Sequence, residues 1–125
     1  MNRFVMFAIA WFILTAYGLF VRPPHLDIVP LFLHFDKFVH FSLFFGQFWL
    51  IVRAYSAQNR PMPILFWCMI AIVWAIVSEL IQSQLPSRSA DVFDALADIL
   101  GAFCALAIGY ILNQHRQRLM KEPQP

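Results

Sequence analysis

The sequence predicts an all-α membrane protein, a small bundle of four transmembrane helices, and two observations carry this prediction. Of the 125 residues, 61% are hydrophobic and only 13% are charged, whereas soluble domains carry about 25% charged residues. The apolar residues also gather into four runs, each near the roughly 20 residues that a helix needs to cross a bilayer. We expect polytopic spans at about 4–21, 37–53, 63–82 and 91–112, within a single domain covering residues 1–125.

The first run, Phe4 to Val21, is expected to be a retained helix rather than a signal peptide. A signal peptide has a shorter apolar core and a small-residue cleavage site, but Val21 is followed by Arg22 and two prolines. Residues 25–35, which contain aromatic residues, histidines and Pro30, are expected to form a loop at the membrane interface.

The ends of the later runs carry residues that commonly cap helices. Asp36 is a candidate cap for the second helix, and Ser87 or Ser89 for the fourth. The fourth helix is expected to end near Leu112. Strands are disfavoured, because a membrane barrel needs at least eight alternating segments of about ten residues.

Charge and cysteine content exclude several functional classes. The net charge is +2 and no basic run exceeds two residues, so nucleic acid is not an expected partner. Cys68 and Cys104 lie inside apolar runs and are expected to be core residues. No recognised metalloenzyme spacing is present, and we expect no bound metal or cofactor. The expected partner is the lipid bilayer; the oligomeric state stays open.

Basic residues predict the orientation in the membrane. Lys and Arg accumulate in cytoplasmic segments near span ends, and six of the nine fall on the side that holds both termini. We therefore expect a multi-pass protein with both termini in the cytoplasm. The basic residues on that side are Arg3, Arg53, Arg60, Arg116, Arg118 and Lys121, against Arg22, Lys37 and Arg88 on the other.

Five of the seven acidic residues are predicted to meet at one end of the bundle, on the outer side. The second helix starts there, the third ends there and the fourth starts there. Helical spacing of three, four or seven residues puts the polar residues of each helix on one face. These residues are Asp36 and His40, Glu79 and Gln82, and Asp91, Asp94 and Asp98; Gly101 and Ala105 continue the last stripe with small side chains that permit close helix contact.

Glu79 and Asp98 carry the strongest functional signal. Both fall within apolar runs, where a charge costs a few kcal/mol and usually marks a functional site. Asp91 and Asp94 have a simpler alternative, because acids in the first turn of a helix favour its dipole. His40 is a stronger candidate than a lone histidine, because it lies beside Asp36 and opposite the acids of the third and fourth predicted helices.

Three motifs in order resemble the VanZ-like membrane family. Its pattern is D-K-x-x-H, then E-x-x-Q, then an Arg followed by D-x-x-A-N-x-x-G. One departure matters, because the usual Asn is Asp98 here; we expect Asp98 to hydrogen-bond across the bundle and to be replaceable by Asn. The matching residues are Asp36, Lys37, His40, Glu79, Gln82, Arg88, Asp94, Asp98 and Gly101, spread over about the middle half of the chain.

The resemblance implies a cell-envelope protein of the bacterial inner membrane, with a link to resistance against teicoplanin-type glycopeptides, but it supplies no reaction. We expect an outward-facing polar pocket that binds an envelope lipid or precursor group, with Lys37, Gln82 and Arg88 as ligand-binding residues. Lys37 and Arg88 can hold phosphate. The alternative is a membrane-embedded enzyme whose candidate catalytic residues are Asp36, His40, Glu79, Asp94 and Asp98.

Three mechanisms stay open beside simple binding. His40 and Glu79 can exchange protons with a substrate, or His40 with Asp36, Glu79 and Asp94 can bind a divalent metal. A transport path would also need polar residues in the other half of the membrane, where Gln47 is almost alone. A purely structural protein is disfavoured by the acids within the spans.

Overall fold

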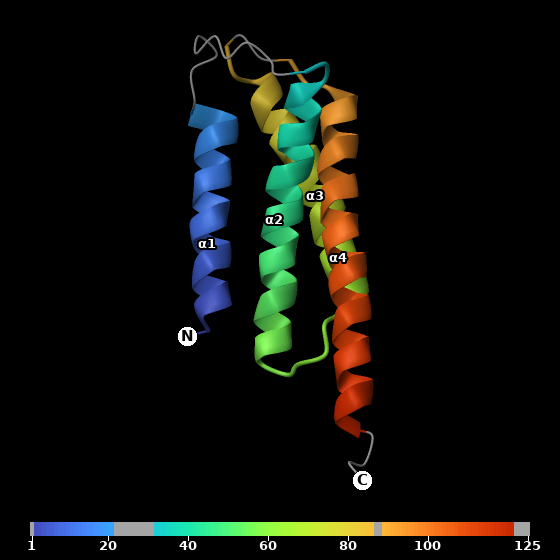
Figure 1. Ribbon diagram of the computed structural model, residues 1–125. Helices are drawn as coiled ribbons and strands as arrows, with labels where there is room; N and C mark the ends of the chain where they lie inside the picture. The colour runs from blue at the N-terminus through green and yellow to red at the C-terminus, as the bar shows by residue number, and fades with distance from the viewer. Residues whose placement is uncertain (1, 22–31, 87–88, 122–125) are drawn as a thin grey trace.

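Four long helices build the chain in a computed structural model that describes residues 2–21, 32–86 and 89–121. The described residues contain no strand, which confirms the all-α prediction, and each predicted span corresponds to one helix. The helices are α1 (Arg3–Ala16), continued by the π-helical segment η1 (Tyr17–Val21), α2 (Phe35–Ala57), α3 (Ile64–Ser83) and α4 (Val92–Lys121) (Figure 1).

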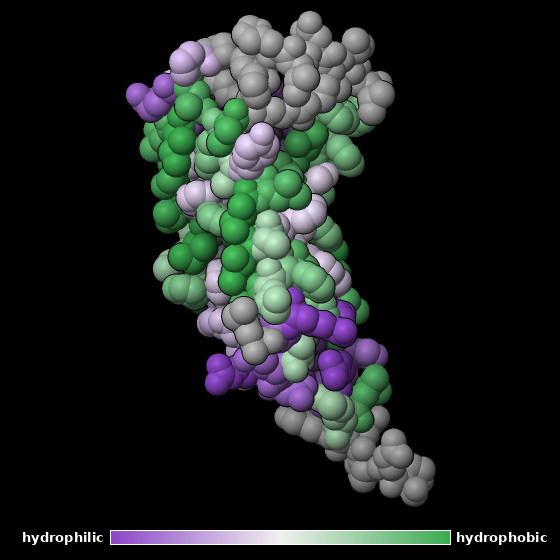
Figure 2. Space-filling view, turned by 90° about the vertical axis from the view of Figure 1, so that its left-hand side faces the viewer, coloured by the Kyte–Doolittle hydropathy of each residue, from purple (hydrophilic) through white to green (hydrophobic). Residues whose placement is uncertain are grey.

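Each helix is long and apolar enough to cross a membrane, as predicted. Large apolar side chains cover the outward faces; Leu65 is 78% exposed and Ile111 is 65% exposed. Figure 2 shows hydrophobic residues over the middle of the molecule and hydrophilic residues gathered near its lower end. A surface of this kind suits a lipid environment. The candidate spans are Arg3–Val21, Phe35–Ala57, Ile64–Ser83 and Val92–Met120.

The helices run alternately up and down, so both termini lie at the same end of the bundle (Figure 1). α4 packs against both α2 and α3, and α1 packs against α2. The start of α2, the end of α3 and the start of α4 therefore meet at the end away from the termini, which we call the distal end.

Small residues let α2 and α4 approach closely. A side-chain carbon on Gly101 would run into the backbone carbonyl oxygen of Phe41, and one on Gly109 would run into the side chain of Val52. Ala105, between the two glycines, is fully buried. The predicted close contact at Gly101 and Ala105 is thus confirmed. This contact fixes the depth at which polar residues of α2 and α4 face each other.

Both predicted helix caps differ from the structure. The residue before α2 is His34, which makes no side-chain cap bond; Asp36 lies inside the first turn and bonds Lys37 instead. The cap of α4 is Asp91, whose Oδ1 accepts the backbone N–H of Phe93 at 2.8 Å. A carboxylate one residue before the helix reaches this N–H, so Ser89 is not needed. Ser87 lies outside the described residues.

Two helices extend past the predicted spans. α2 runs from Phe35 to Ala57 rather than from 37 to 53, and α4 continues to Lys121 rather than ending at Leu112. Hydropathy marks the apolar part of a helix, not its end, and residues such as Gln, Arg and Leu after 112 favour helix in water as well. The predicted interface loop at 25–35 lies mostly outside the described residues.

Candidate functional site

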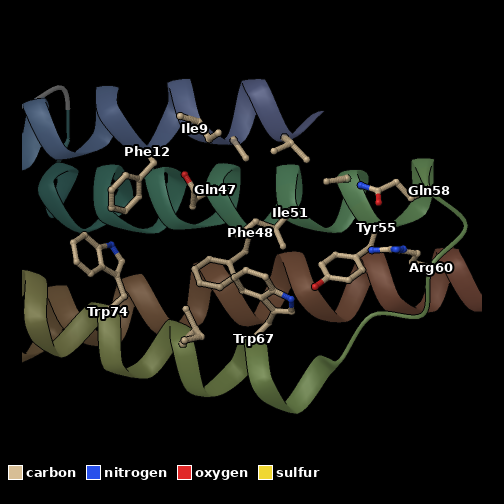
Figure 3. A pocket seen from close by; sticks show the side chains of 14 residues that line it. Ile9, Phe12, Gln47, Phe48, Ile51, Tyr55, Gln58, Arg60, Trp67 and Trp74 are labelled. Atoms are coloured by element: carbon tan, nitrogen blue, oxygen red, sulfur yellow. The ribbon is translucent and has the colours of Figure 1, made fainter. Parts of the chain in front are cut away.

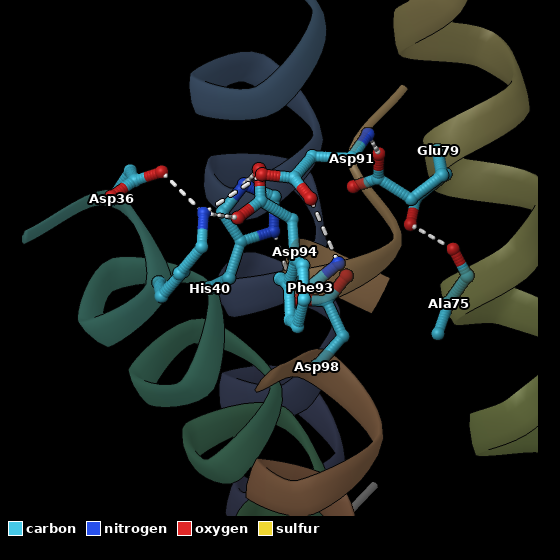
Figure 4. Close-up of polar contacts among 10 residues, drawn as sticks. Asp36, His40, Ala75, Glu79, Asp91, Phe93, Asp94 and Asp98 are labelled. Atoms are coloured by element: carbon cyan, nitrogen blue, oxygen red, sulfur yellow. Dashed lines mark hydrogen bonds and ion pairs between the residues drawn. The ribbon is translucent and has the colours of Figure 1, made fainter. Parts of the chain in front are cut away.

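Three helix ends bring most of the predicted polar residues together at the distal end (Figure 4). α2 contributes three of them from its first two turns, α3 contributes one from its last turns, and the remaining three come from the start of α4. We call this group the polar cluster: Asp36, Lys37, His40, Glu79, Asp91, Asp94 and Asp98. Gln82 is buried one turn after Glu79, and Arg88 lies outside the described residues.

Lys37 is enclosed by carboxylates from two helices. Its Nζ donates to Oδ2 of Asp36, Oδ2 of Asp91 and Oδ1 of Asp94, each at 2.9 Å. An ammonium group has three donors, so all of them are engaged. The charge-assisted bonds tie the start of α2 to the start of α4.

Exposure falls steadily from the surface into the bundle. The side chain of Asp36 is 59% exposed, that of Asp94 is 13% exposed, and that of Asp98 is fully buried. The order follows helical geometry, because each turn of α4 carries the next acid about 5 Å deeper. The polar cluster is therefore open at its outer end and closed at its inner end.

His40 lies between two acids of α4. Its Nδ1 is 3.0 Å from Oδ1 of Asp98, where a ring N–H can donate to the carboxylate. Its Nε2 is 3.8 Å from Oδ2 of Asp94. The expected bond of Asp98 across the bundle is present, and its partner is His40. Carboxylates on both sides therefore fix the orientation of the imidazole ring.

Glu79 connects α3 to the start of α4. It is buried, and its Oε2 accepts the backbone N–H of Asp91 at 3.0 Å. Its other oxygen, Oε1, has no hydrogen-bond partner, and neither has Oδ2 of Asp98. Nε2 of Gln82 is also buried without a partner. Buried polar atoms are nearly always bonded, so these three atoms leave hydrogen-bonding capacity in the inner part of the cluster for a water molecule or another ligand.

The acidity of Asp91, which lies just before the α4 span, is set by Lys37. The ammonium group bonded to Oδ2, together with the backbone N–H of Phe93 on Oδ1, holds the pKa of this carboxyl below its usual range. Asp91 therefore stays ionised into the acidic range. The ion pair of Asp91 with Lys37 therefore persists at neutral pH at the outer end of the cluster.

Two sets of side chains are close enough to hold a metal ion. Within each set the ligand atoms lie within 4.8 Å of one another. One set already surrounds the ammonium of Lys37, whose charge takes the place of a metal cation. The other differs from the metal set that the sequence left open as an alternative, because it contains Asp98 in place of Asp36 and Asp94. The outer set is Asp36, Asp91 and Asp94, and the inner set is His40, Glu79 and Asp98.

Below Asp98 the bundle core becomes apolar. Ala102, Ala105 and Leu106 on α4 and Phe44 and Phe48 on α2 are all buried there. An ion path across the membrane would have to pass these side chains, and the described residues offer no polar chain through them.

A groove along α1 was not predicted from the sequence. It measures about 590 Å³ and opens between α1, α2 and α3, away from the polar cluster (Figure 3). Aromatic and aliphatic side chains line it, and Arg60 lies at one end. Oε1 of Gln47 and Nε1 of Trp67 are buried without a partner beside it. Sequence patterns do not reveal such a groove, because it depends on how α1 docks on its neighbours.

Comparison with known proteins does not assign a family. No family model matches the chain, and no solved structure matches it. A protein of Schizosaccharomyces pombe described as uncharacterized is 31% identical over 86 residues, which are 69% of this chain and 52% of that protein. The chain thus spans about half the length of this relative. The VanZ-like resemblance and the roles of the site residues stay predictions.

Proposed function

We propose that this chain is a VanZ-like membrane protein whose polar cluster binds the amine-bearing headgroup of a membrane lipid or envelope precursor. One observation supports this best: carboxylates from three helices converge, and Lys37 is the sole Lys or Arg beside them among the described residues. A site with an excess of one charge concentrates ligands of the opposite charge. The carboxylates are Asp36, Glu79, Asp91, Asp94 and Asp98.

A phosphate is a poorer fit to the described residues, although the sequence suggested one. The three donors of Lys37 are all engaged by carboxylates. A phosphate placed there would have to displace an acid and would face the remaining ones. Like charges at this range repel, so the anionic part of a ligand is better placed outside the cluster.

The outer acids have room for an ammonium group. The side chains of Asp36 and Asp91 are 59% and 38% exposed, and Lys37 uses only one oxygen of each. A primary amine brings three N–H donors that match the remaining lone pairs. Because the cluster lies at the ends of three spans, a bound amine would sit at headgroup level.

The predicted orientation gives this site its biological setting. If the basic side of the protein faces the cytoplasm, the polar cluster faces outward across a bacterial inner membrane. It would then meet headgroups and precursors on that face. The link to teicoplanin-type glycopeptide resistance rests on the family resemblance alone.

Lipid retention tests the proposal. The purified chain is equilibrated with equal amounts of phosphatidylethanolamine, phosphatidylcholine and phosphatidylglycerol in the presence of a chelator. Native mass spectrometry then identifies and quantifies the lipid that stays bound. We expect preferential retention of the primary amine, and Asp36→Asn with Asp91→Asn should reduce the preference about fivefold, as loss of about 1 kcal/mol predicts.

Two control variants accompany the experiment. His115→Ala changes an exposed side chain at the far end of α4, and Arg60→Gln changes the apolar groove; both should keep the preference. Equal retention of the three lipids by the unaltered chain would contradict the proposal.

A membrane-embedded acid–base enzyme is the second candidate, favoured by the geometry of His40. An imidazole bonded to one buried acid, with a second acid 3.8 Å from its other nitrogen, is arranged to take up and release a proton. Incubation with lipid should then release a headgroup or acyl product that mass spectrometry detects, and His40→Gln should abolish the release. Absence of any product would leave binding as the function.

A further inference from the structure

We propose that the inner set of the polar cluster, His40, Glu79 and Asp98, binds one divalent metal ion. The three side chains come from three different helices, α2, α3 and α4, and each is buried. This proposal goes beyond headgroup binding and does not depend on it, because the outer acids that would meet an amine belong to the other set.

The spacing of the ligand atoms fits a single ion. Nδ1 of His40 and Oδ1 of Asp98 are 3.0 Å apart, and His40, Glu79 and Asp98 each offer one ligand atom within 4.8 Å of the other two. Ligands bound at about 2.1 Å to one ion lie roughly 3.0 to 3.4 Å apart when adjacent. The three side chains therefore have to draw closer together only modestly to surround one ion.

Unpartnered oxygens point to a cation rather than to a closed hydrogen-bond network. Oδ2 of Asp98, on a side chain that is fully buried, has no donor, and Oε1 of Glu79, on a side chain that is 6% exposed, has none. Two carboxylates this close in the core repel each other unless a proton or a cation neutralises one of them. Asp98 and Glu79 together have four carboxylate oxygens, and His40 bonds one of them, Oδ1 of Asp98.

No lysine or arginine among the described residues supplies a positive charge to the inner set. The ammonium of Lys37 is bonded to Asp36, Asp91 and Asp94. The other described Lys and Arg residues lie toward the opposite end of the bundle, at the termini and around the connection between α2 and α3. A metal ion would satisfy the two free oxygens and the excess of negative charge together.

The surrounding residues resemble the support that metal ligands receive in known sites. Metal-binding histidines usually donate their second ring N–H to a carboxylate. If Nδ1 of His40 binds the ion, Nε2 faces Asp94 at 3.8 Å, and Lys37 holds Asp94 in place. The second oxygen of Glu79 is likewise fixed by the N–H of Asp91.

The donor set indicates the class of metal. One imidazole and two carboxylates combine the nitrogen that Zn²⁺ and Fe²⁺ prefer with the oxygens that Mn²⁺ prefers. We therefore expect a divalent ion between Mn²⁺ and Zn²⁺ in the first transition series, rather than Ca²⁺ or a thiolate-bound ion. Mn²⁺ and Zn²⁺ are suitable probes.

Equilibrium dialysis of the full chain tests the site. The chain is purified without a histidine tag, stripped with a chelator, and dialysed against Mn²⁺ or Zn²⁺ before metal determination by mass spectrometry. We expect one ion per chain. Asp98→Asn and Glu79→Gln, which keep side-chain shape, should each weaken binding at least about tenfold. His115→Ala, which removes an exposed histidine at the far end of α4, should bind as the unaltered chain does.

Three results would overturn the proposal. The first is no bound metal in the unaltered chain, which would mean that the inner set shares a proton instead. The second is undiminished binding by both Asp98→Asn and Glu79→Gln. The third is loss of binding in Asp36→Asn alone, which would move the ion to the outer set. The lipid experiment runs in chelator, so either proposal can fail without the other.

A second readout serves if the two acid variants do not fold. A chain in which His25, His34 and His115 are replaced by Gln keeps His40 as its single histidine. Nitrogen-15 NMR of its imidazole should show a large Zn²⁺-dependent shift of the Nδ1 signal. An unchanged imidazole spectrum at saturating Zn²⁺ would contradict the proposal.

Discussion

His40 and Asp98 are 58 positions apart in the chain, yet Nδ1 of His40 lies 3.0 Å from Oδ1 of Asp98 in the core. This contact joins α2 to α4 at the closed end of the polar cluster. It also sits one turn above Gly101, where the two backbones touch. The polar pair and the tight helix contact therefore depend on the same register.

Two substitutions at Asp98 should show whether its charge or its hydrogen bond to His40 stabilises the fold. Asp98→Asn keeps a carbonyl oxygen that accepts the ring N–H, so thermal unfolding in detergent should change little. Asp98→Leu leaves the imidazole of His40 unpaired in the core, which costs about 3 to 5 kcal/mol, and the midpoint should fall sharply. A similar fall for both variants would mean that the ionic pair itself, not the hydrogen bond, holds the helices.

Gly101→Ala should destabilise the bundle, because its new methyl group meets the carbonyl oxygen of Phe41. Forcing an extra carbon into a packed contact costs about 1 to 3 kcal/mol. Gly18→Ala is the matched control, because nothing lies within 4 Å of the added carbon. Thermal unfolding of both variants measures the difference, and equal midpoints would refute close contact between α2 and α4 at this point.

Lowering the pH should destabilise the folded chain, because protonation of Asp91 breaks its ion pair with Lys37. Its pKa is lowered in the folded chain by the Lys37 ammonium, so its stabilising effect is present above the unfolded value of 3.8 and is lost as the pH falls through the lower folded value. Asp91→Asn keeps the helix cap but removes the charge. Unfolding midpoints measured between pH 7 and pH 2 should fall less for this variant; parallel curves would show that the pair contributes nothing.

The fold class was predictable because lipid imposes a simple rule on the sequence. Runs of apolar residues of the right length must be helices that satisfy their own backbone bonds. Phe4 to Val21 and Ile64 to Ile81 illustrate this, since each became part of one helix with ends close to those predicted. Helix ends that lie in water were harder to predict, because α4 continues through polar residues as far as Lys121.

The convergence of acids was predictable, but their partners were not. Spacing within a helix places Asp94 and Asp98 on one face, and alternating helix direction brings that face to His40. The three bonds of Lys37, two of them to residues 54 and 57 positions away, depend on the register between α2 and α4. The register is set by contacts such as Gly101 with Phe41, which no single-helix pattern specifies. Arg88 lies outside the described residues.

The orientation can be read with reporter fusions. Both termini lie at the end opposite the polar cluster (Figure 1), and the excess of basic residues there predicts that they face the cytoplasm. Alkaline phosphatase, which is active only outside the cytoplasm, should be inactive when fused after Lys121 and active when fused after Arg88. The reverse pattern would place the cluster on the cytoplasmic side.

The distance between a bound amine and the acids of the cluster tests the central claim most directly. The chain is labelled with carbon-13 at aspartate Cγ and placed in bilayers of phosphatidylethanolamine labelled with nitrogen-15 in the headgroup. Dipolar recoupling NMR should show aspartate Cγ within about 4 Å of the amine nitrogen, as a charge-assisted hydrogen bond requires, and the signal should weaken in Asp36→Asn with Asp91→Asn. Absence of any carbon–nitrogen coupling in the unaltered chain would contradict headgroup binding by the polar cluster.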